Sequence, residues 1–153
     1  MRSRQPYVAV VGPGDATDAQ AQTAEAVGRS LAEAGAVVVC GGLGGVMAAA
    51  CRGASSAGGL TVGILPGPDR SSANEWVEIG IPTGLGELRN GLVVRAADVM
   101  IGVGGGYGTL SEIALALKGG VPVVGIGTWQ IDGIASAESA EEAVEQALSL
   151  ARR

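Results

Sequence analysis

Residues 102–113 read GVGGGYGTLSEI, with glycine at four of the five positions from Gly104 to Gly108. The apolar run Val99-Met100-Ile101 precedes this cluster, and a second apolar run at 113–117 follows it. The first run is typical of a strand and the second of a helix. Because glycine costs conformational entropy on folding, such a cluster indicates backbone that must approach something a Cβ atom would block. We therefore predict a strand, a glycine turn and a helix N-terminus, with a ligand at the turn.

Other parts of the chain repeat this arrangement of strand, turn and helix. The runs at 7–12, 36–40, 60–65, 98–103 and 121–126 are apolar at nearly every position, as in strands buried on both faces of a parallel sheet. Helix-like segments lie at 18–34, 45–57, 86–97 and 109–118, and a sixth short strand is expected at 77–81. Ser139 and Glu142 have the spacing of a capping box for a C-terminal helix. This order predicts an α/β fold: a single doubly wound Rossmann-like domain over residues 1–153, with a mainly parallel sheet flanked by helices.

The composition excludes several classes of function. The chain has 153 residues and no histidine, which removes the commonest general base, the Ser–His triad and most catalytic zinc sites. We expect no metal site, and the net charge of −5 argues against nucleic-acid binding. No apolar run approaches the ~20 residues of a membrane span, and we expect no signal peptide. Cys40 and Cys51 belong to no disulfide framework, so we expect buried thiols in a cytoplasmic protein.

Three strand ends are rich in glycine and supply the predicted binding residues. In parallel sheets ligands bind beyond the carboxyl ends of the strands, and the free N–H groups at a helix start favour phosphate. The candidates are Gly12 and Gly14 in the first turn; Gly41, Gly42, Gly44, Gly45 and Met47 in the second; and Gly105, Gly106, Tyr107, Gly108 and Thr109 in the third.

The form of these turns narrows the ligand to a mononucleotide or a similar phosphate ester. The first turn has Thr17 where a dinucleotide fingerprint needs its third glycine, and the second strand ends in Cys40-Gly41 rather than in an acidic residue. The only lysine, Lys118, does not have the spacing of a Walker motif. An ordinary NAD site and a Walker-type site are therefore disfavoured.

The order of the motifs resembles a known family. Residues 104–112 resemble the PGGxGTxxE signature of the Lonely Guy (LOG) phosphoribohydrolases, and residues 41–47, GGLGGVM, resemble their GGGxxGLMG turn. Arg89, fifteen residues before the third turn, falls where that family has the arginine of an Arg-Lys pair. The combination of residues 81–84, 89–90 and 104–109 is similar to the bacterial branch that includes molybdenum-cofactor-carrier-like proteins.

This resemblance implies two functions of different class. In the LOG enzymes the positions of Arg89 and Glu112 are catalytic, and they cleave the N-glycosidic bond of a nucleoside 5′-monophosphate to release base and ribose 5-phosphate. Asn90 replaces the family's lysine and Gly104 its proline. The loss of the lysine favours binding without turnover, so the leading hypothesis is a carrier or sensor and the hydrolase is the alternative. We also predict that Asn90 contacts the ligand.

The resemblance also implies partners. We expect that the protein requires no cofactor for activity. The expected bound ligand is a nucleoside monophosphate or a molybdopterin-type compound. Family relatives are oligomers, and the apolar residues of segment 86–97 can supply a self-complementary face. We therefore expect a homodimer or homotetramer that binds a small phosphorylated ligand, with no nucleic-acid or membrane partner.

Several of the candidates also have a purely structural explanation. Thr109 and Glu112 have the spacing of a capping box, so Glu112 can cap its helix as well as face a ligand. Arg89 can pair in solvent with Glu87 or a nearby carboxylate instead of contacting phosphate. Met47 is also typical of a core position, and Trp76, in the polar loop 66–82, either stacks on a base or packs against the fold.

Overall fold

The computed structural model describes residues 4–152, which form a seven-stranded sheet in which every neighbouring pair of strands is parallel. The strands are β1 (Tyr7–Val11), β2 (Val37–Cys40), β3 (Thr61–Leu65), β4 (Ile79–Pro82), β5 (Val99–Val103), β6 (Val123–Ile126) and β7 (Ile134–Ser136). The helices are α1 (Asp18–Glu33), α2 (Val46–Ser56), the 3-10 helix η1 (Gly86–Arg89), α3 (Asn90–Ala96), α4 (Tyr107–Lys118) and α5 (Ala140–Ala151). These elements are the predicted doubly wound α/β fold.

The strand order places a reversal of direction at the centre of the sheet. The order is β4-β3-β2-β1-β5-β6-β7, so β1 lies between β2 and β5. Val8 is in register with Val38 on one side and with Val99 on the other. The chain runs outward from β1 to β4 and then returns to the opposite side of β1. In such sheets ligands bind at this switch point, outside the carboxyl ends of the strands.

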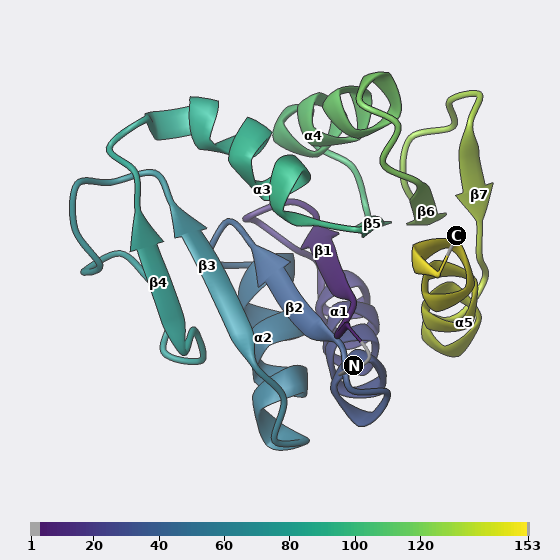
Figure 1. Ribbon diagram of the computed structural model, residues 1–153, viewed down its shortest axis with the longest axis horizontal. Coiled ribbons are helices and arrows are strands. Elements are labelled where there is room, and N and C mark those ends of the chain that lie inside the picture. Colours follow the sequence, from purple (N-terminus) through teal and green to yellow (C-terminus); the bar gives the residue numbers. More distant parts are fainter. Residues whose placement is uncertain (1–3, 153) are drawn as a thin grey trace.

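Helices cover both faces of the sheet (Figure 1), with α1, α2 and α5 on one face and α3 and α4 on the other. The apolar strand residues divide between the two layers by alternation. Val38 and Ile101 pack toward α1 and α2, whereas Val39 and Met100 pack toward α3 and α4. All of these side chains are buried, which explains why the strands read as continuous apolar runs.

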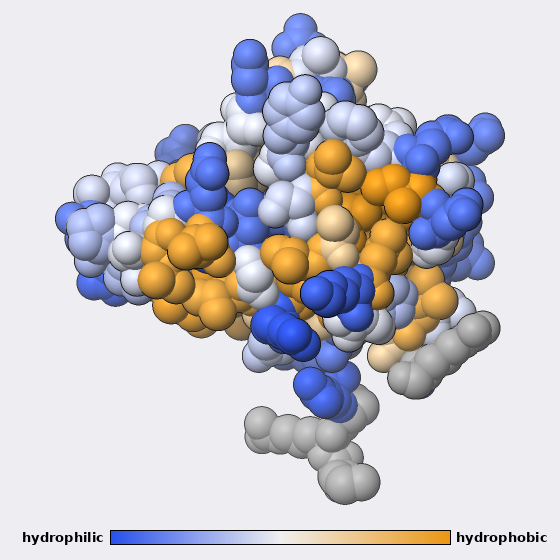
Figure 2. Space-filling model, turned by 90° about the horizontal axis from the view of Figure 1, so that it is seen from above, coloured by the Kyte–Doolittle hydropathy of each residue, from blue (hydrophilic) through white to orange (hydrophobic). Residues whose placement is uncertain are grey.

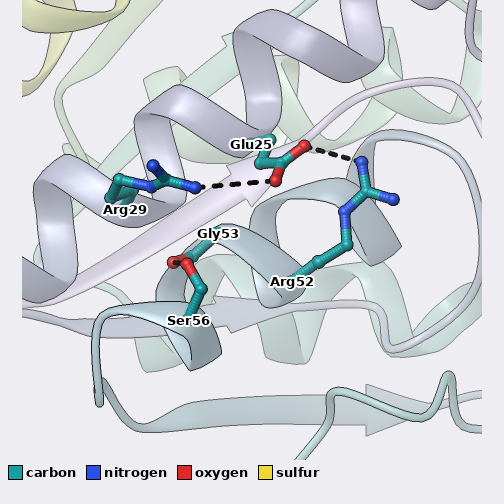
Figure 3. Close-up of polar contacts among 5 residues, drawn as sticks. All are labelled: Glu25, Arg29, Arg52, Gly53 and Ser56. Carbon is teal, nitrogen blue, oxygen red and sulfur yellow. Dashed lines mark hydrogen bonds and ion pairs between the residues drawn. The ribbon is translucent and has the colours of Figure 1, made fainter.

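Helices α1 and α2 approach one another through glycine. An ideal Cβ atom at Gly28 would lie 2.0 Å from the carbonyl oxygen of Ala50, and one at Gly53 would lie 2.0 Å from that of Glu25. Ion pairs flank this contact, as Figure 3 shows: the Glu25 carboxylate lies 2.6 Å from Arg52 Nη2 and 3.8 Å from Arg29 Nη2. The missing side chains therefore set how closely the two helices pack.

The structure corrects several predicted boundaries. The segment 86–97 is not one helix, because Gly86 has a φ of +60°, outside the α-helical region, and the α-helix begins only at Asn90. Strand β4 covers 79–82 rather than 77–81, and the three-residue strand β7 was not predicted. Helix α4 begins at Tyr107, two residues before its predicted start. No helix within 4–152 is long and apolar enough to cross a membrane.

Candidate functional site

A cleft of about 830 Å³ lies beyond the carboxyl ends of β1 and β5, at the switch point of the sheet. All three glycine-rich turns contribute to its wall. Gly12 and Gly14 come from the first turn, Gly41 from the second, and Gly106 and Gly108 from the third. Segment 86–90 closes the cleft on the side of α3. The fold therefore brings together the turns that the sequence singled out.

The buried polar side chains of the protein are concentrated at this cleft. Among residues 4–152, five polar or charged residues are buried: Thr61, Arg89, Asn90, Thr109 and Glu112. All except Thr61 line the cleft. Thr61 is satisfied by hydrogen bonds to the backbone of residues 76 and 78. Because polar side chains are seldom buried in a core, the gathering of the other four at one cleft indicates a site rather than a packing layer.

Arg89 is held in place by the protein itself. Its Nε donates to the carbonyl oxygen of Ile64 at 2.9 Å, its Nη2 donates to that of Gly41 at 3.4 Å, and its Nη1 donates to Asn90 Oδ1. Arg89 is buried, and it forms none of the ion pairs found within residues 4–152. The predicted alternative of a solvent-exposed pair with Glu87 is therefore wrong, because backbone carbonyls take the place of the carboxylate.

The departures from the LOG pattern around Arg89 have a structural role. A lysine at position 90 has no acceptor, whereas the side-chain oxygen of Asn90 accepts a hydrogen bond from the guanidinium. At Gly41 an ideal Cβ atom would lie 2.7 Å from Arg89 Nη2 and 2.9 Å from Met47 Sδ. Gly41 thus makes room for the arginine, and Asn90 orients it. One N–H group on each Nη atom of Arg89 remains free for a ligand.

Glu112 is a buried carboxyl group facing the same cleft. Burial raises its pKa from an ordinary value of 4.5 to about 7, and the nearby positive charge of Arg89 opposes that rise. Its side chain is 8% exposed. The raised pKa brings the titration of this carboxyl group toward neutral pH, where it can exchange a proton with a ligand.

The first turn of α4 has no side-chain cap. The N-cap residue is Gly106, and no side chain accepts a hydrogen bond from the first turn. Thr109 and Glu112 do not form the predicted capping box, because that box requires Thr109 as the N-cap residue and the N-cap lies three residues earlier, at Gly106. The Thr109 side chain is 2% exposed, and its Oγ1 has no hydrogen-bond partner within residues 4–152. The N–H groups of residues 107–109 also lack intrahelical acceptors.

Three glycines leave the backbone of the cleft uncovered. An ideal Cβ atom at Gly14 or Gly108 would meet nothing within 4 Å, and one at Gly106 would meet only Pro13 Cβ, at 3.9 Å. None of the three has a positive φ. Neither packing nor backbone conformation therefore requires glycine here, and the backbone at these three positions is open to close approach from the cleft.

Four glycines predicted to bind the ligand do not line the cleft: Gly42, Gly44, Gly45 and Gly105. Gly42 and Gly45 have φ values of +78° and +64°, so their turn requires glycine for its backbone conformation. Gly105 lies against the ring of Trp129, 3.1 Å from its Nε1 to an ideal Cβ. Gly42, Gly45 and Gly105 therefore shape the turns around the site, and sequence spacing could not separate them from their neighbours.

Of the aromatic residues that the sequence singled out, Tyr107 lies at the cleft and Trp76 does not. Trp76 does not line the cleft; it lies 5.6 Å from the guanidinium carbon of Arg52. Tyr107 does line the cleft, and its ring stacks on that of Trp129 with the ring centroids 6.4 Å apart. Sequence reasoning gave Trp129 no role, because nothing local indicates a contact across 23 positions with Gly106, whose carbonyl oxygen accepts from Trp129 Nε1 at 3.1 Å.

The side-chain charges of the cleft are mainly negative. Asp15, Glu87 and Glu112 line it, and Arg89 is its only basic residue. An anionic ligand would therefore depend on backbone N–H groups and on Arg89 rather than on a broad positive surface. Within residues 4–152, no three acidic, cysteine or histidine side chains are grouped so as to hold a metal ion.

Comparison with known proteins places the chain in a family. Residues 5–152 match the sequence profile of the SLOG cluster4 family. The chain belongs to this family. A relative from Archaeoglobus fulgidus is 43% identical over 143 residues, which cover 93% of this chain and 94% of the relative.

Two solved structures resemble the chain over nearly its whole length. One is a molybdenum cofactor binding protein from the phototrophic bacterium Rippkaea orientalis, with a TM-score of 0.92 and 37% identity, covering 97% of this chain and 99% of that one. The other is a molybdenum cofactor carrier protein from Chlamydomonas reinhardtii, with a TM-score of 0.90 and 35% identity, covering 98% and 100%. These matches confirm the resemblance to LOG-like proteins and to their molybdenum-cofactor-carrier-like branch.

Apolar side chains also lie exposed beside the cleft. Figure 2 looks down on the face that carries η1, α3 and α4, and it shows apolar residues gathered there. On these elements Leu88 is 79% exposed, and Leu92 and Leu115 are exposed by 43% and 42%. An exposed apolar surface of this kind is typical of a protein contact. The homodimer or homotetramer expected from the sequence stays a prediction.

Proposed function

We propose that this protein binds a phosphorylated pterin of the molybdenum cofactor class in the cleft between the β1 and β5 turns, and that it carries the ligand without converting it. The observation that carries this proposal is the unpartnered Oγ1 of Thr109, buried at the uncapped start of α4. The two similar structures, a molybdenum cofactor binding protein and a molybdenum cofactor carrier protein, supply the class of ligand.

The start of α4 suits a phosphate group. The N–H groups of residues 107–109 and the Thr109 hydroxyl give several donors on one side of the cleft, and the helix dipole adds a partial positive charge. Gly106 and Gly108 let an anion approach the backbone without meeting a Cβ atom. By contrast, a capping box between Thr17 and Gln20 already provides acceptors for N–H groups at the start of α1. Within residues 4–152, helix α2 also lacks a side-chain cap, and α4 differs from it in the buried, unpartnered hydroxyl of Thr109.

Arg89 and Asn90 support binding without turnover. Three protein acceptors fix the guanidinium, so its charge is placed before a ligand arrives and little ordering remains to be done on binding. No lysine stands beside it. A rigid Arg89 side chain and the glycine turns can hold a ligand in place, and a carrier needs to hold its ligand.

Replacing Thr109 with valine is expected to weaken ligand binding at least tenfold, because valine keeps the shape of the side chain but removes one donor to a charged phosphate. Thr109→Ser retains the hydroxyl and is expected to bind as the wild type does. Calorimetry with 6-hydroxymethylpterin phosphate and with ribose 5-phosphate measures both variants, and molybdenum content after purification from a cofactor-producing bacterium gives a second readout. Equal affinity of the valine variant and the wild type would contradict the phosphate site.

The alternative function is a nucleoside 5′-monophosphate phosphoribohydrolase, and Glu112 is the observation that favours it. A buried carboxyl group with a pKa of about 7 suits a general base. In that reaction the Glu112 carboxylate takes a proton from water, the water oxygen bonds to the ribose C1′, and the glycosidic electron pair leaves with the base. The departing base is protonated from solvent.

The hydrolase reading predicts release of a free base that rises with pH through about 7 and is abolished by Glu112→Gln. Chromatography of a panel of nucleoside 5′-monophosphates, incubated with micromolar protein at pH 6 and pH 8, measures this release. Release of one base by the wild type alone would replace the carrier by an enzyme. No release from any nucleotide, together with bound pterin, would leave the carrier as the function.

A further inference from the structure

We propose that Tyr107 and Trp129 form a stacking platform for the flat heteroaromatic ring of the ligand, at the rim of the cleft. This inference rests on the proposed function, because it places the ring of a ligand whose phosphate binds at the start of α4. It adds Trp129 to the candidate residues and gives Tyr107 a mode of recognition: selection for a planar ring rather than for phosphate alone.

The first step of the argument is the exposure of Tyr107. Its side chain is 86% exposed, although tyrosine usually buries most of its ring. The chain has only two tyrosines, two tryptophans and no phenylalanine. One of these four aromatic residues, Tyr107, therefore lines the cleft and stacks on a second, Trp129, in a protein that otherwise builds its core from aliphatic side chains.

The second step is that Trp129 holds this tyrosine from one side. The ring centroids are 6.4 Å apart and the ring planes are inclined by 28°, an offset stacked arrangement. Trp129 is itself fixed, because its Nε1 donates to the carbonyl oxygen of Gly106 and its ring packs on Gly105. One side of the Tyr107 ring is thus supported, and the rest of it is open to solvent.

The third step is position. Tyr107 is the first residue of α4, and it lines the same cleft as Thr109 and Gly108. A phosphate at the first turn of α4 therefore brings the rest of the ligand within reach of the Tyr107 ring. Stacking of a flat ring on an aromatic side chain tolerates different ring systems, so the platform accepts a pterin or a purine.

The test compares probes that share a phosphate and differ in the ring. Affinities of GMP, 6-hydroxymethylpterin phosphate and ribose 5-phosphate are measured by calorimetry for the wild type, Tyr107→Ala and Tyr107→Phe. For the wild type, we expect the affinity of GMP and of 6-hydroxymethylpterin phosphate, the two ring-bearing probes, to be roughly tenfold higher than the affinity of ribose 5-phosphate. Tyr107→Ala should remove most of that advantage and leave the affinity for ribose 5-phosphate unchanged, and Tyr107→Phe should retain it.

Fluorescence gives an independent readout. In a Trp76→Phe background Trp129 is the only tryptophan, and a ring-bearing probe should change its emission whereas ribose 5-phosphate should not. The platform is overturned if ring-bearing probes bind no more tightly than ribose 5-phosphate, or if Tyr107→Ala keeps their advantage. A lower molecular mass of Tyr107→Ala by light scattering, with unchanged affinities, would also overturn it and assign the pair to an interface.

These outcomes separate the platform from the proposed function. If ribose 5-phosphate binds and Thr109→Val weakens it, the phosphate site stands whatever Tyr107 does. If no probe binds at all, the proposed function and the platform both fail.

Discussion

Replacing Gly28 with alanine is expected to lower the free energy of unfolding by about 2–4 kcal/mol, although alanine is the better helix former. The new Cβ atom would lie 2.0 Å from the carbonyl oxygen of Ala50 and 2.8 Å from its carbonyl carbon. Both are backbone atoms of α2, so the clash is relieved only if α1 and α2 move apart. That separation costs more than the ~1 kcal/mol that alanine gains in helix propensity.

The same substitution at Gly91 provides the control and should have the opposite sign. Gly91 lies in α3, its φ is not positive, and an ideal Cβ atom there meets nothing within 4 Å. Gly91→Ala is therefore expected to raise the free energy of unfolding by about 0.5–1 kcal/mol. Urea unfolding followed by circular dichroism measures both variants. A Gly28→Ala variant as stable as the wild type would mean that the two helices do not pack at this distance.

Much of the fold could be predicted because strand burial leaves a strong local signal. Val37, Val38 and Val39 are all buried, and a run of that kind fits only a strand with helices on both faces. The glycine turns that follow such strands marked the carboxyl edge of the sheet. Their meeting in one cleft then followed from the topology of a parallel sheet.

The function of single residues within a turn could not be predicted in the same way. Gly105 and Gly106 are neighbours in one motif, yet Gly105 makes room for Trp129 and Gly106 lines the cleft. Gly28 and Gly53 resemble tolerated helix glycines in the sequence, and only the packing of α1 on α2 shows what they exclude. In each case the atom that a Cβ would meet belongs to a segment distant in the sequence.

The predicted capping box between Thr109 and Glu112 does not form, for a related reason. Thr109 and Glu112 have the required spacing, but a box forms only if the threonine is the N-cap residue. Gly106 takes that position with an extended backbone, at φ −140° and ψ 178°. The helix therefore begins early and turns Thr109 and Glu112 into buried residues of its first two turns. What looked like a local structural pair is instead part of the cleft.

Replacing Glu112 with glutamine is expected to stabilise the folded protein at alkaline pH and to change little at acid pH. Burial raises the pKa of Glu112 in the folded state to about 7, above its ordinary value of 4.5. The folded protein therefore binds a proton that the unfolded chain has lost. The stability from that proton is fully present below about pH 4.5 and is lost as the pH rises through 7. Glutamine carries no charge at any pH and avoids this loss.

The size of the effect follows from the shift. The free energy of unfolding of Glu112→Gln, minus that of the wild type, should increase by about 2–3 kcal/mol when the pH is raised from 5 to 8. Urea unfolding at both pH values measures the gain, with Glu145→Gln, at an exposed position on α5, as the matched control that should show less than ~0.5 kcal/mol. A Glu112→Gln curve parallel to the wild type would mean that the carboxyl group is solvated in the folded protein. A measured gain would instead establish a buried acid at the cleft, whose protonation a bound anion would favour because the neutral form removes one negative charge from its surroundings.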